Sequence, residues 1–344
     1  MQKTAFITGI SGQDGAYLAS FLLNRGYAVH GGMRRTSTGS IDRLKELNVS
    51  HDVIIHDFEL SEITNMQRVL NEVCPDEIYN LAAQSFVGTS FEQPIYTSNI
   101  DGLGPLRVLE IIRTQKSKTK FYQASTSEMF GRVQSDPQDE ETAFYPRSSY
   151  GISKLFAHWS TVNYRQAYDI FACSGILFNH ESPLRGREFV TRKITLGLAK
   201  IKHGKQDVLE LGNLDAKRDW GFAGDYVAGM WAMLQAEKPD DFVLATGVAH
   251  TVRSFVEVAA NRLGMEIAWE GTGIQERGIE VGSGRAVVAI SPRFFRPAEV
   301  DVLRGSSLKA EELLNWRPRV SFEELVSLMA EADERRVRDG QRLD

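Results

Sequence analysis

The chain has 344 residues, 42% of them hydrophobic and 25% charged, which is typical of a soluble globular protein with one large domain or two smaller ones. Its formal net charge of −5 argues against a general nucleic-acid-binding protein, which normally carries a basic face. Cys74 and Cys173 stand apart with no Cys-x-x-Cys pair, so neither a zinc site nor a disulfide framework is supported. Without a signal peptide or an apolar run of about 20 residues, we expect no membrane attachment and a cytoplasmic location.

The first half of the chain alternates short β-branched segments with longer helical patterns. The expected strands are Lys3–Gly9, Ala28–Arg34, Asp52–Asp57, Glu77–Ala83 and Lys120–Thr126. The expected helices between them are Asp14–Gly26, Ser61–Val73 and Pro94–Thr114. This alternation predicts βαβ units, and therefore an α/β fold with a Rossmann-type doubly wound parallel sheet.

The second half begins with the same pattern and then becomes irregular. A helix at Tyr150–Tyr168 and strands at Phe171–Phe178 and Asp241–Gly247 are expected. Segments rich in Gly, Arg and Pro predict loops at Asn179–Arg187, Gly271–Arg285 and Ser291–Pro297. Later helices are expected at Gly224–Ala236, Val252–Leu263, Ser307–Leu314 and Phe322–Arg336. We therefore expect a nucleotide-binding domain at 1–178, with a returning segment near 220–250. A smaller, interleaved and discontinuous substrate lobe should occupy most of 179–344.

A glycine-rich loop follows the first strand and opens a helix. It reads Gly9-Ile10-Ser11-Gly12-Gln13-Asp14-Gly15, with G-x-x-G-x-x-G spacing. Glycines let the backbone turn tightly and approach a pyrophosphate, and the N–H groups at a helix start can face the phosphates. The motif alone is weak, but its βαβ context favours a dinucleotide site over a turn that binds no ligand.

The ends of the next strands supply further cofactor candidates. Arg34 and Arg35 stand where an acidic residue would bind the ribose 2′-OH of NAD. Because arginine grips a phosphate in a bidentate way, they favour NADP, the alternative being solvated surface charges. Asp57 and Phe58 should border the adenine. The residues expected to line the middle of the cofactor follow the fourth strand: Leu81, Ala82, Ala83, Gln84 and Ser85.

Four residues form the candidate catalytic group. Tyr150 and Lys154, four positions apart, share one face of a predicted helix, so the ammonium can lower the pKa of the phenol toward that of a general base. Lys154 can also hold the nicotinamide ribose. Thr126 ends the fifth strand, where its hydroxyl could polarise a substrate oxygen, and Glu128 could remove a proton beside a newly formed ketone. The alternatives are an ordinary helix pair and an exposed glutamate with no role.

At these motifs the chain resembles the extended short-chain dehydrogenase/reductase superfamily. Later segments narrow the resemblance to the GDP-mannose 4,6-dehydratase family: Phe178–Gly186, Arg192–Thr195, Leu211–Gly221 and Phe295–Val300. The resemblance runs from Lys3 to about Glu324. It implies a hydro-lyase that converts GDP-mannose into GDP-4-dehydro-6-deoxy-mannose and uses NADP as a temporary hydride store.

The resemblance also implies residue roles. Tyr150 would deprotonate the 4-hydroxyl while hydride leaves C4, Glu128 would take the C5 proton and assist loss of water from C6, and Thr126 would hydrogen-bond the oxygen on C4. His180 and Arg185 would contact the cofactor. The residues expected to hold the GDP-sugar are Ser85, Asn179, Lys193, Arg218, Arg296 and Glu299. No metal is implied, whereas a homodimer or homotetramer is.

Several alternatives remain open at this point. The same dehydration could act on another GDP-sugar such as GDP-manno-heptose, and Phe294-Phe295, where the family often carries a tyrosine, puts the fine substrate preference in doubt. A sugar-nucleotide 4-epimerase or 4-reductase would not need Glu128. A cofactor-binding regulator without catalysis would be expected to have lost Tyr150 or Lys154.

Overall fold

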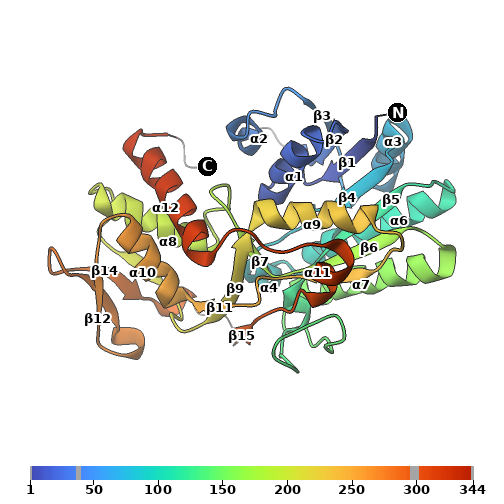
Figure 1. Ribbon diagram of the computed structural model, residues 1–344. Helices are drawn as coiled ribbons and strands as arrows, with labels where there is room; N and C mark the ends of the chain where they lie inside the picture. The colour runs from blue at the N-terminus through green and yellow to red at the C-terminus, as the bar shows by residue number, and fades with distance from the viewer. Residues whose placement is uncertain (1, 36–39, 295–301, 342–344) are drawn as a thin grey trace. The chain divides into compact units, whose positions relative to one another are not determined.

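The computed structural model describes residues 2–35, 40–294 and 302–341, and the chain divides into two compact units (Figure 1). The first unit comprises Met1–Phe178, Ala223–Gly247 and Gly305–Pro318. The second, smaller unit comprises Asn179–Phe222, Val248–Arg304 and Arg319–Asp344. The return of residues 305–318 to the first unit was not anticipated from the sequence. Along the described part of the chain, no helix combines the length and the apolar character that crossing a bilayer requires.

The first unit is built on a sheet of seven parallel strands. They are β1 (Thr4–Thr8), β2 (Ala28–Met33), β3 (Val53–Asp57), β4 (Glu77–Asn80), β5 (Lys120–Thr126), β6 (Ala172–Leu177) and β10 (Asp241–Leu244). Their spatial order is β10-β6-β5-β4-β1-β2-β3, and every neighbouring pair is parallel. Successive crossovers therefore leave β1 and β4 in opposite directions, which makes this pair the switch point where open α/β sheets bind ligands.

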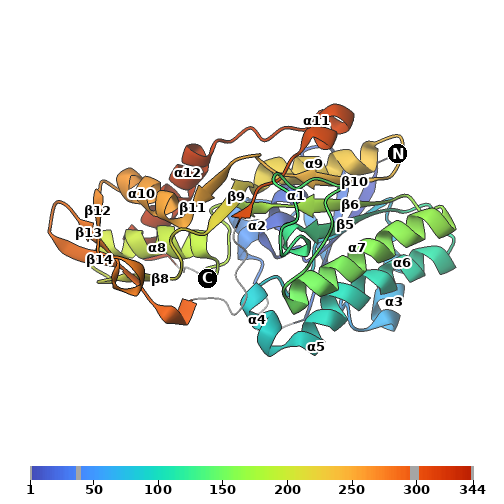
Figure 2. The ribbon, with the colours of Figure 1, turned by 90° about the horizontal axis from the view of Figure 1, so that it is seen from below.

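Helices cover both faces of this sheet. In Figure 2, α1 (Gln13–Leu23) and α9 (Ala223–Gln235) lie on one side, and α3 (Ile63–Val73), α6 (Gly104–Thr114) and α7 (Ser149–Tyr168) lie on the other. The strands are correspondingly apolar along their length: Ala5, Phe6 and Ile7 are fully buried, and all of β6 is buried. Such continuous burial is typical of a parallel sheet covered on both faces. The predicted Rossmann-type doubly wound fold is confirmed, and the predicted strands differ only in their ends.

One predicted helix of the first unit is interrupted. Instead of a continuous helix over Pro94–Thr114, the chain forms α5 (Pro94–Thr97), a π-helical segment η1 (Ser98–Leu103) and then α6. Pro105 explains the break, because it has no N–H to donate to the carbonyl of Asp101 four residues earlier. Three short helices complete this unit: α2 (Asp42–Glu46), α4 (Val87–Glu92) and α11 (Leu308–Leu314).

The second unit contains two four-stranded sheets. One consists of β7 (Asn179–Glu181), β9 (Lys217–Phe222), β11 (Ala249–Thr251) and β15 (Val302–Leu303). The other consists of β8 (Leu209–Leu211), β12 (Ile267–Glu270), β13 (Arg277–Glu280) and β14 (Arg285–Ile290). Its main helices are α8 (Val190–Lys202), α10 (Val252–Arg262) and α12 (Phe322–Arg338). The core centres on Trp220, whose ring lies 5.3 Å from that of Phe255 and 6.2 Å from that of Phe322, measured between centroids.

Two loop predictions in the second unit were wrong in part. Asn179–Arg187 includes β7, and Gly271–Arg285 includes β13. Each strand is only three or four residues long, too short to show an alternating pattern, and each exists because a neighbouring strand pairs with it. Of the predicted loop Ser291–Pro297, the described part contains a 3-10 turn at Pro292–Phe294.

Candidate active site

The glycine-rich loop forms a tight turn between β1 and α1. Gly9 has a φ of +70°, and a Cβ there would come within 2.9 Å of the Ala82 backbone at the end of β4. A Cβ at Gly15 would lie 2.4 Å from the Gly9 carbonyl oxygen, so this glycine brings α1 close to the loop. Gly12 donates its N–H to the Gly9 carbonyl, and α1 starts at Gln13, with Asp14 in its first turn. The loop therefore places a helix start at the switch point, as a dinucleotide site requires.

The loop at 81–85 is anchored to the sheet and to η1. The Thr8 hydroxyl oxygen accepts the N–H groups of Leu81 and Ala82, each at 3.0 Å. The N–H of Gln84 donates to Asp101 Oδ1 at 2.7 Å. Ala83 is half-buried and Ser85 is exposed. The segment expected to line the cofactor is thus held at both of its ends.

The remaining cofactor candidates of the first unit lie at strand ends. Arg34 and Arg35 are exposed, and Arg34 Nη1 donates to the Tyr96 hydroxyl at 2.7 Å. Asp57 is exposed at the end of β3. Phe58 is buried, with its ring 4.9 Å from that of Phe6, so its side chain packs into the core of the first unit.

Arg43 contacts the glycine-rich loop, and the sequence did not predict this contact. Arg43 Nη1 donates to the main-chain oxygen of Ser11 at 3.1 Å, which fixes the middle of the glycine-rich turn. It lies on α2, a helix of five residues that had no clear signature in the sequence.

Tyr150 and Lys154 lie one helical turn apart at the start of α7. Ser148 caps this helix, its hydroxyl accepting the N–H of Gly151 at 3.0 Å. Both side chains are buried, and Lys154 Nζ lies 5.8 Å from the centroid of the Tyr150 ring. Lys154 Nζ also donates to the Ala124 carbonyl on β5 at 3.1 Å. The Lys154 ammonium and the Tyr150 ring therefore lie near each other in the buried first turn of α7.

Thr126 and Glu128 lie against the first turn of α7. Thr126 ends β5, and its hydroxyl accepts the Glu128 N–H at 3.2 Å to cap the 3-10 turn Ser127–Met129. A Cβ on Gly151 would lie 2.8 Å from the Glu128 carbonyl oxygen, so the glycine next to Tyr150 permits this close approach. Glu128 is half-buried, whereas Thr126 is buried. A hydroxyl, a carboxyl, a phenol and an ammonium group thus belong to two adjoining segments.

A chain of buried amides supports the lysine. Thr8 donates to Asn80 Oδ1 at 2.8 Å, Asn80 Nδ2 donates to Gln123 Oε1 at 2.9 Å, and Gln123 Nε2 donates to the Ala124 carbonyl at 3.0 Å. That carbonyl is the one that accepts from Lys154. Polar residues near the ends of otherwise apolar strands could have predicted this hydrogen-bonded chain from the sequence, because a fully buried polar side chain needs a hydrogen-bond partner.

The described candidates of the second unit lie on the strands β7 and β9, on the helix α8 and on the loop between β7 and α8. Asn179 and His180 lie on β7, paired with Trp220 and Gly221 of β9. Arg218, also on β9, is buried and donates to the Lys217 carbonyl at 2.8 Å. Arg296 and Glu299 lie outside the described residues.

Lys193 contacts an aromatic ring. Its ammonium lies 3.0 Å from the centroid of the Phe294 ring, and burial, with Arg293 nearby, lowers the pKa of Lys193 to about 8. A partly desolvated ammonium of this kind binds an anion more strongly than a hydrated one does. This geometry suits a residue that is expected to hold a diphosphate.

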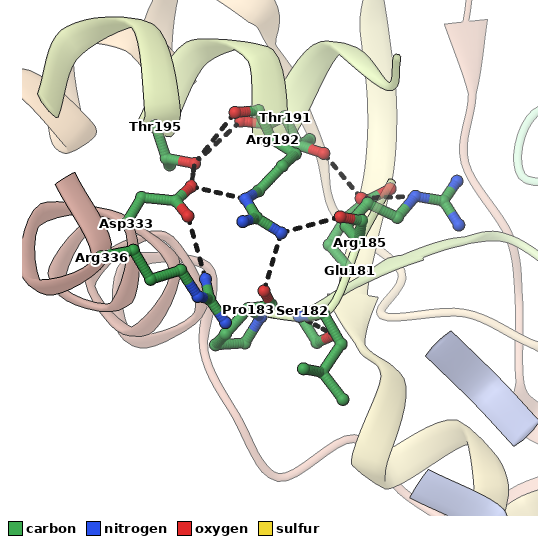
Figure 3. A network of polar contacts seen from close by, with 10 residues as sticks. Glu181, Ser182, Pro183, Arg185, Thr191, Arg192, Thr195, Asp333 and Arg336 are labelled. Atoms are coloured by element: carbon green, nitrogen blue, oxygen red, sulfur yellow. Dashed lines mark hydrogen bonds and ion pairs between the residues drawn. The ribbon is translucent and has the colours of Figure 1, made fainter. Parts of the chain in front are cut away.

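The loop that carries Arg185 is fixed by a buried ionic network (Figure 3). Arg192 donates to Asp333 Oδ2 at 2.7 Å and to the carbonyls of Pro183 and Arg185 at 2.9 Å each. Arg336 donates to the other oxygen of Asp333 at 2.9 Å. Arg185 itself pairs with Glu181 at 3.0 Å. Helices α8 and α12 therefore hold the backbone that presents Arg185.

No metal centre accompanies these groups in the ranges that the structure describes. Within them, no set of three or more His, Cys, Asp or Glu side chains is arranged to hold a metal ion.

Comparison with known proteins reveals strong similarity along the chain. The family model described as GDP-mannose 4,6 dehydratase matches residues 6–329. The chain is 53% identical to the GDP-mannose 4,6-dehydratase of Sinorhizobium fredii, over 96% of this chain and 97% of that one. It is 50% identical to the GDP-mannose 4,6 dehydratase of Homo sapiens, over 96% and 91% of the two chains.

Solved structures show the same fold at lower identity. A dTDP-glucose 4,6-dehydratase from Streptomyces venezuelae, with NAD and TYD bound, superposes with a TM-score of 0.82 at 20% identity, covering 98% of this chain and 99% of that one. The protein RMD from Pseudomonas aeruginosa, complexed with NADPH, superposes with a TM-score of 0.76 at 21% identity, covering 97% and 100%.

Proposed function

This chain belongs to the GDP-mannose 4,6-dehydratase family, and we propose that it converts GDP-mannose into GDP-4-dehydro-6-deoxy-mannose and water. One observation carries the proposal. Thr126 and Glu128, at the end of β5, adjoin the helical turn that bears Tyr150 and Lys154. An epimerase or a reductase on the same scaffold would need the phenol and the ammonium, but not the carboxylate.

The residues divide the chemistry between them. Thr126 hydrogen-bonds the oxygen on C4, and Tyr150 takes the proton of the 4-hydroxyl with the charge of Lys154 beside it. Glu128 then takes the proton on C5, which is acidic next to the ketone, and passes it to the hydroxyl on C6, which leaves as water. A nicotinamide dinucleotide held beside Lys154 would supply reversible hydride storage between C4 and C6, and Tyr150 would return its proton to C5. The sugar ends with one water fewer, and there is no net redox change.

The glycine-rich turn fits a dinucleotide. Gly9 and Gly15 let the turn pack closely against the Ala82 backbone and against the start of α1, whose amides lie at the switch point. The residues proposed to hold the cofactor in the first unit are Gly9, Ser11, Gly12, Gln13, Asp14, Gly15, Asp57, Phe58, Leu81, Ala82, Ala83, Gln84, Ser85 and Lys154.

We further propose that the cofactor is NADP. Exposed Arg34 and Arg35 at the end of β2 would pair with its 2′-phosphate, and His180 and Arg185 of the second unit would contact it as well. Mass spectrometry of the nucleotide released from the purified protein identifies it directly, and NAD alone would contradict this assignment.

The substrate proposal rests on the cations of the second unit. Lys193 and Arg218 would pair with the diphosphate, and Asn179, Ser85, Arg296 and Glu299 would hydrogen-bond the rest of the GDP-sugar. We propose GDP-mannose because of family membership. Comparing kcat/KM for GDP-mannose and GDP-manno-heptose decides between the two sugars.

Isotope transfer tests the proposed function. GDP-mannose carrying deuterium at C4 is expected to give a 4-keto-6-deoxy product with deuterium at C6 of the same molecule, because the hydride is stored on bound cofactor. Mixing labelled and unlabelled substrate should produce no crossover. Conversion to an isomer without loss of water would assign the protein as an epimerase, and absence of any product would refute catalysis.

The close approach of Gly151 to the Glu128 backbone predicts that a side chain at position 151 lowers activity. In Gly151→Ala, the new methyl group meets the Glu128 backbone, which no side-chain rotation relieves, so Glu128 is displaced from Tyr150. We expect kcat for GDP-mannose to fall by about 10²-fold, as for other displacements of about 1 Å in an active site. The matched control is Gly282→Ala, where a Cβ would meet no atom within 4 Å. Equal kcat values in the two variants would contradict the packing argument.

We also propose that the chain associates with a second copy. Helices α5 and α7 pack together and expose large apolar side chains: Ile95 (82% exposed), Ile152 (57%), Trp159 (54%) and Phe156 (46%). Three of them, at positions 152, 156 and 159, share one face of α7. A contiguous apolar stripe of this kind suits a self-complementary contact between like subunits. Sedimentation velocity tests it, and a chain that stays monomeric at micromolar concentration would contradict it.

A further inference from the structure

Asp101 is a buried carboxyl that the proposed mechanism does not use. It lies in η1, the π-helical segment created by Pro105, and its side chain is fully buried. π-helical segments inside α-helices are rare and frequently mark functional sites. Because an ionised carboxylate without compensation is costly inside a protein, the partners of Asp101 define its role.

The two carboxyl oxygens of Asp101 have different surroundings. Oδ1 accepts the Gln84 N–H at 2.7 Å, which ties Asp101 to the loop at 81–85. Oδ2 is buried and has no hydrogen-bond partner among the described residues. The hydrogen bond to the loop therefore uses only one oxygen of Asp101, and it does not compensate the negative charge of the ionised carboxylate.

Lys154 is the positive charge that acts on Asp101. Burial raises the pKa of Asp101 to about 6, and the charge of Lys154 opposes that rise. Burial likewise lowers the pKa of Lys154, and the charges of Asp101 and, more weakly, of Asp14 oppose that fall. Lys154 donates to the Ala124 carbonyl and not directly to either aspartate in the described structure, so the coupling acts through space.

Backbone packing keeps η1, which carries Asp101, close to the part of α7 that carries Lys154. The Ser153 hydroxyl, next to Lys154, donates to the Ser98 hydroxyl at the start of η1 at 3.2 Å. A Cβ on Gly102 would lie 3.4 Å from the Phe156 ring, so η1 packs closely on α7 at this point. The charged groups that act on Lys154 from the surrounding elements are Asp101 of η1 and Asp14 of α1. On its own helix, the Tyr150 ring lies 5.8 Å from the ammonium.

We propose that Asp101 is a positioning residue that keeps Lys154 charged inside the buried site and fixes the cofactor loop through the amide of Gln84. The charge on Lys154 in turn favours the phenolate of Tyr150. The catalytic consequence rests on the proposed function, whereas the electrostatic coupling is a property of the folded chain alone.

Asp101→Asn separates the two roles, because asparagine keeps an oxygen acceptor for Gln84 and loses the charge. In the full-length protein labelled with ¹³C-lysine, the NMR signal of Lys154 is identified by its absence from Lys154→Arg. We expect its titration midpoint to move to lower pH by about 1 unit or more in Asp101→Asn, since the ammonium loses its opposite charge. Asp101→Ser removes the charge with a smaller side chain and should give the same shift if the asparagine variant does not fold.

Glu140→Gln is the matched control. Glu140 is another poorly exposed carboxylate of the first unit that accepts a backbone N–H, from Val243 at 2.7 Å, and its pKa is also raised by burial. It does not act on Lys154, so this variant should leave the midpoint unchanged. An unchanged midpoint in Asp101→Asn, or an equal shift in Glu140→Gln, would overturn the inference.

The pH dependence of turnover extends the test. The alkaline limb of the kcat/KM profile for GDP-mannose should move to lower pH in Asp101→Asn, because Lys154 then loses its charge earlier. If the chain did not turn over GDP-mannose at all, the NMR shift would still hold, and the proposed function alone would fail. A shifted midpoint with an unmoved alkaline limb would contradict the link from Lys154 to catalysis.

Discussion

Replacing Glu128 with glutamine is expected to lower kcat for GDP-mannose by about 10²- to 10⁴-fold, the range typical of losing a positioned general base. Glutamine preserves the size of the side chain and the capped turn at Thr126, which depends on the main-chain N–H of Glu128. The first oxidation uses Thr126, Tyr150, Lys154 and the cofactor, and it does not need Glu128. The absorbance of reduced nicotinamide should therefore build up when GDP-mannose is added to this variant and should not decay.

Tyr150→Phe is the contrasting control for that experiment. Without the phenol, the proton of the 4-hydroxyl has no acceptor, so neither product nor reduced nicotinamide should accumulate. Full turnover in Glu128→Gln would show that another group takes the C5 proton. Glu128 would then no longer support the assignment as a dehydratase.

Replacing Asp333 with alanine is expected to cost about 3–5 kcal/mol of unfolding free energy, the range for removing one partner of a buried ion pair. Asp333 is fully buried, and its two oxygens accept from Arg192 and Arg336, which are themselves buried. The variant removes the carboxylate that the two buried guanidinium groups share. Chemical denaturation followed by circular dichroism measures the loss.

Glu331→Ala, on the same helix, is the matched control for Asp333. Glu331 pairs with Arg262, and both side chains are substantially exposed, at 35% and 51%. Solvent-exposed pairs of this kind contribute about 0–1 kcal/mol. Similar losses in the two variants would contradict the view that burial decides the contribution of the network.

The parts of the site that the sequence predicted are those with local signatures. The spacing of Gly9, Gly12 and Gly15 reflects a turn that admits no side chain, and the spacing of Tyr150 and Lys154 reflects one turn of a helix. Both are consequences of backbone geometry and so can be found in a short window of residues. The strands of the first unit were predictable for the same reason, since their apolar runs are continuous.

The parts that the sequence did not predict depend on distant partners. Asp101 sits inside a segment with helical periodicity and has the composition of a helix surface, yet Pro105 changes the hydrogen bonding and the fold buries it beside Lys154. The strand β7 has only three residues, and its pairing with β9 involves residues about forty positions away. Such features follow from tertiary packing, which overrides local propensity.

The division of the chain into interleaved segments has a consequence for its synthesis. Strand β10, which completes the edge of the parallel sheet beside β6, and helix α9, which covers it, are made only after the segment Asn179–Phe222 has been translated. While the ribosome works through those residues, β6 presents an unpaired edge to other chains. During that stage the open edge of β6 exposes the nascent first unit to aggregation or to capture by chaperones. The sheet is completed only when β10, which follows the first segment of the second unit in the sequence, has been made.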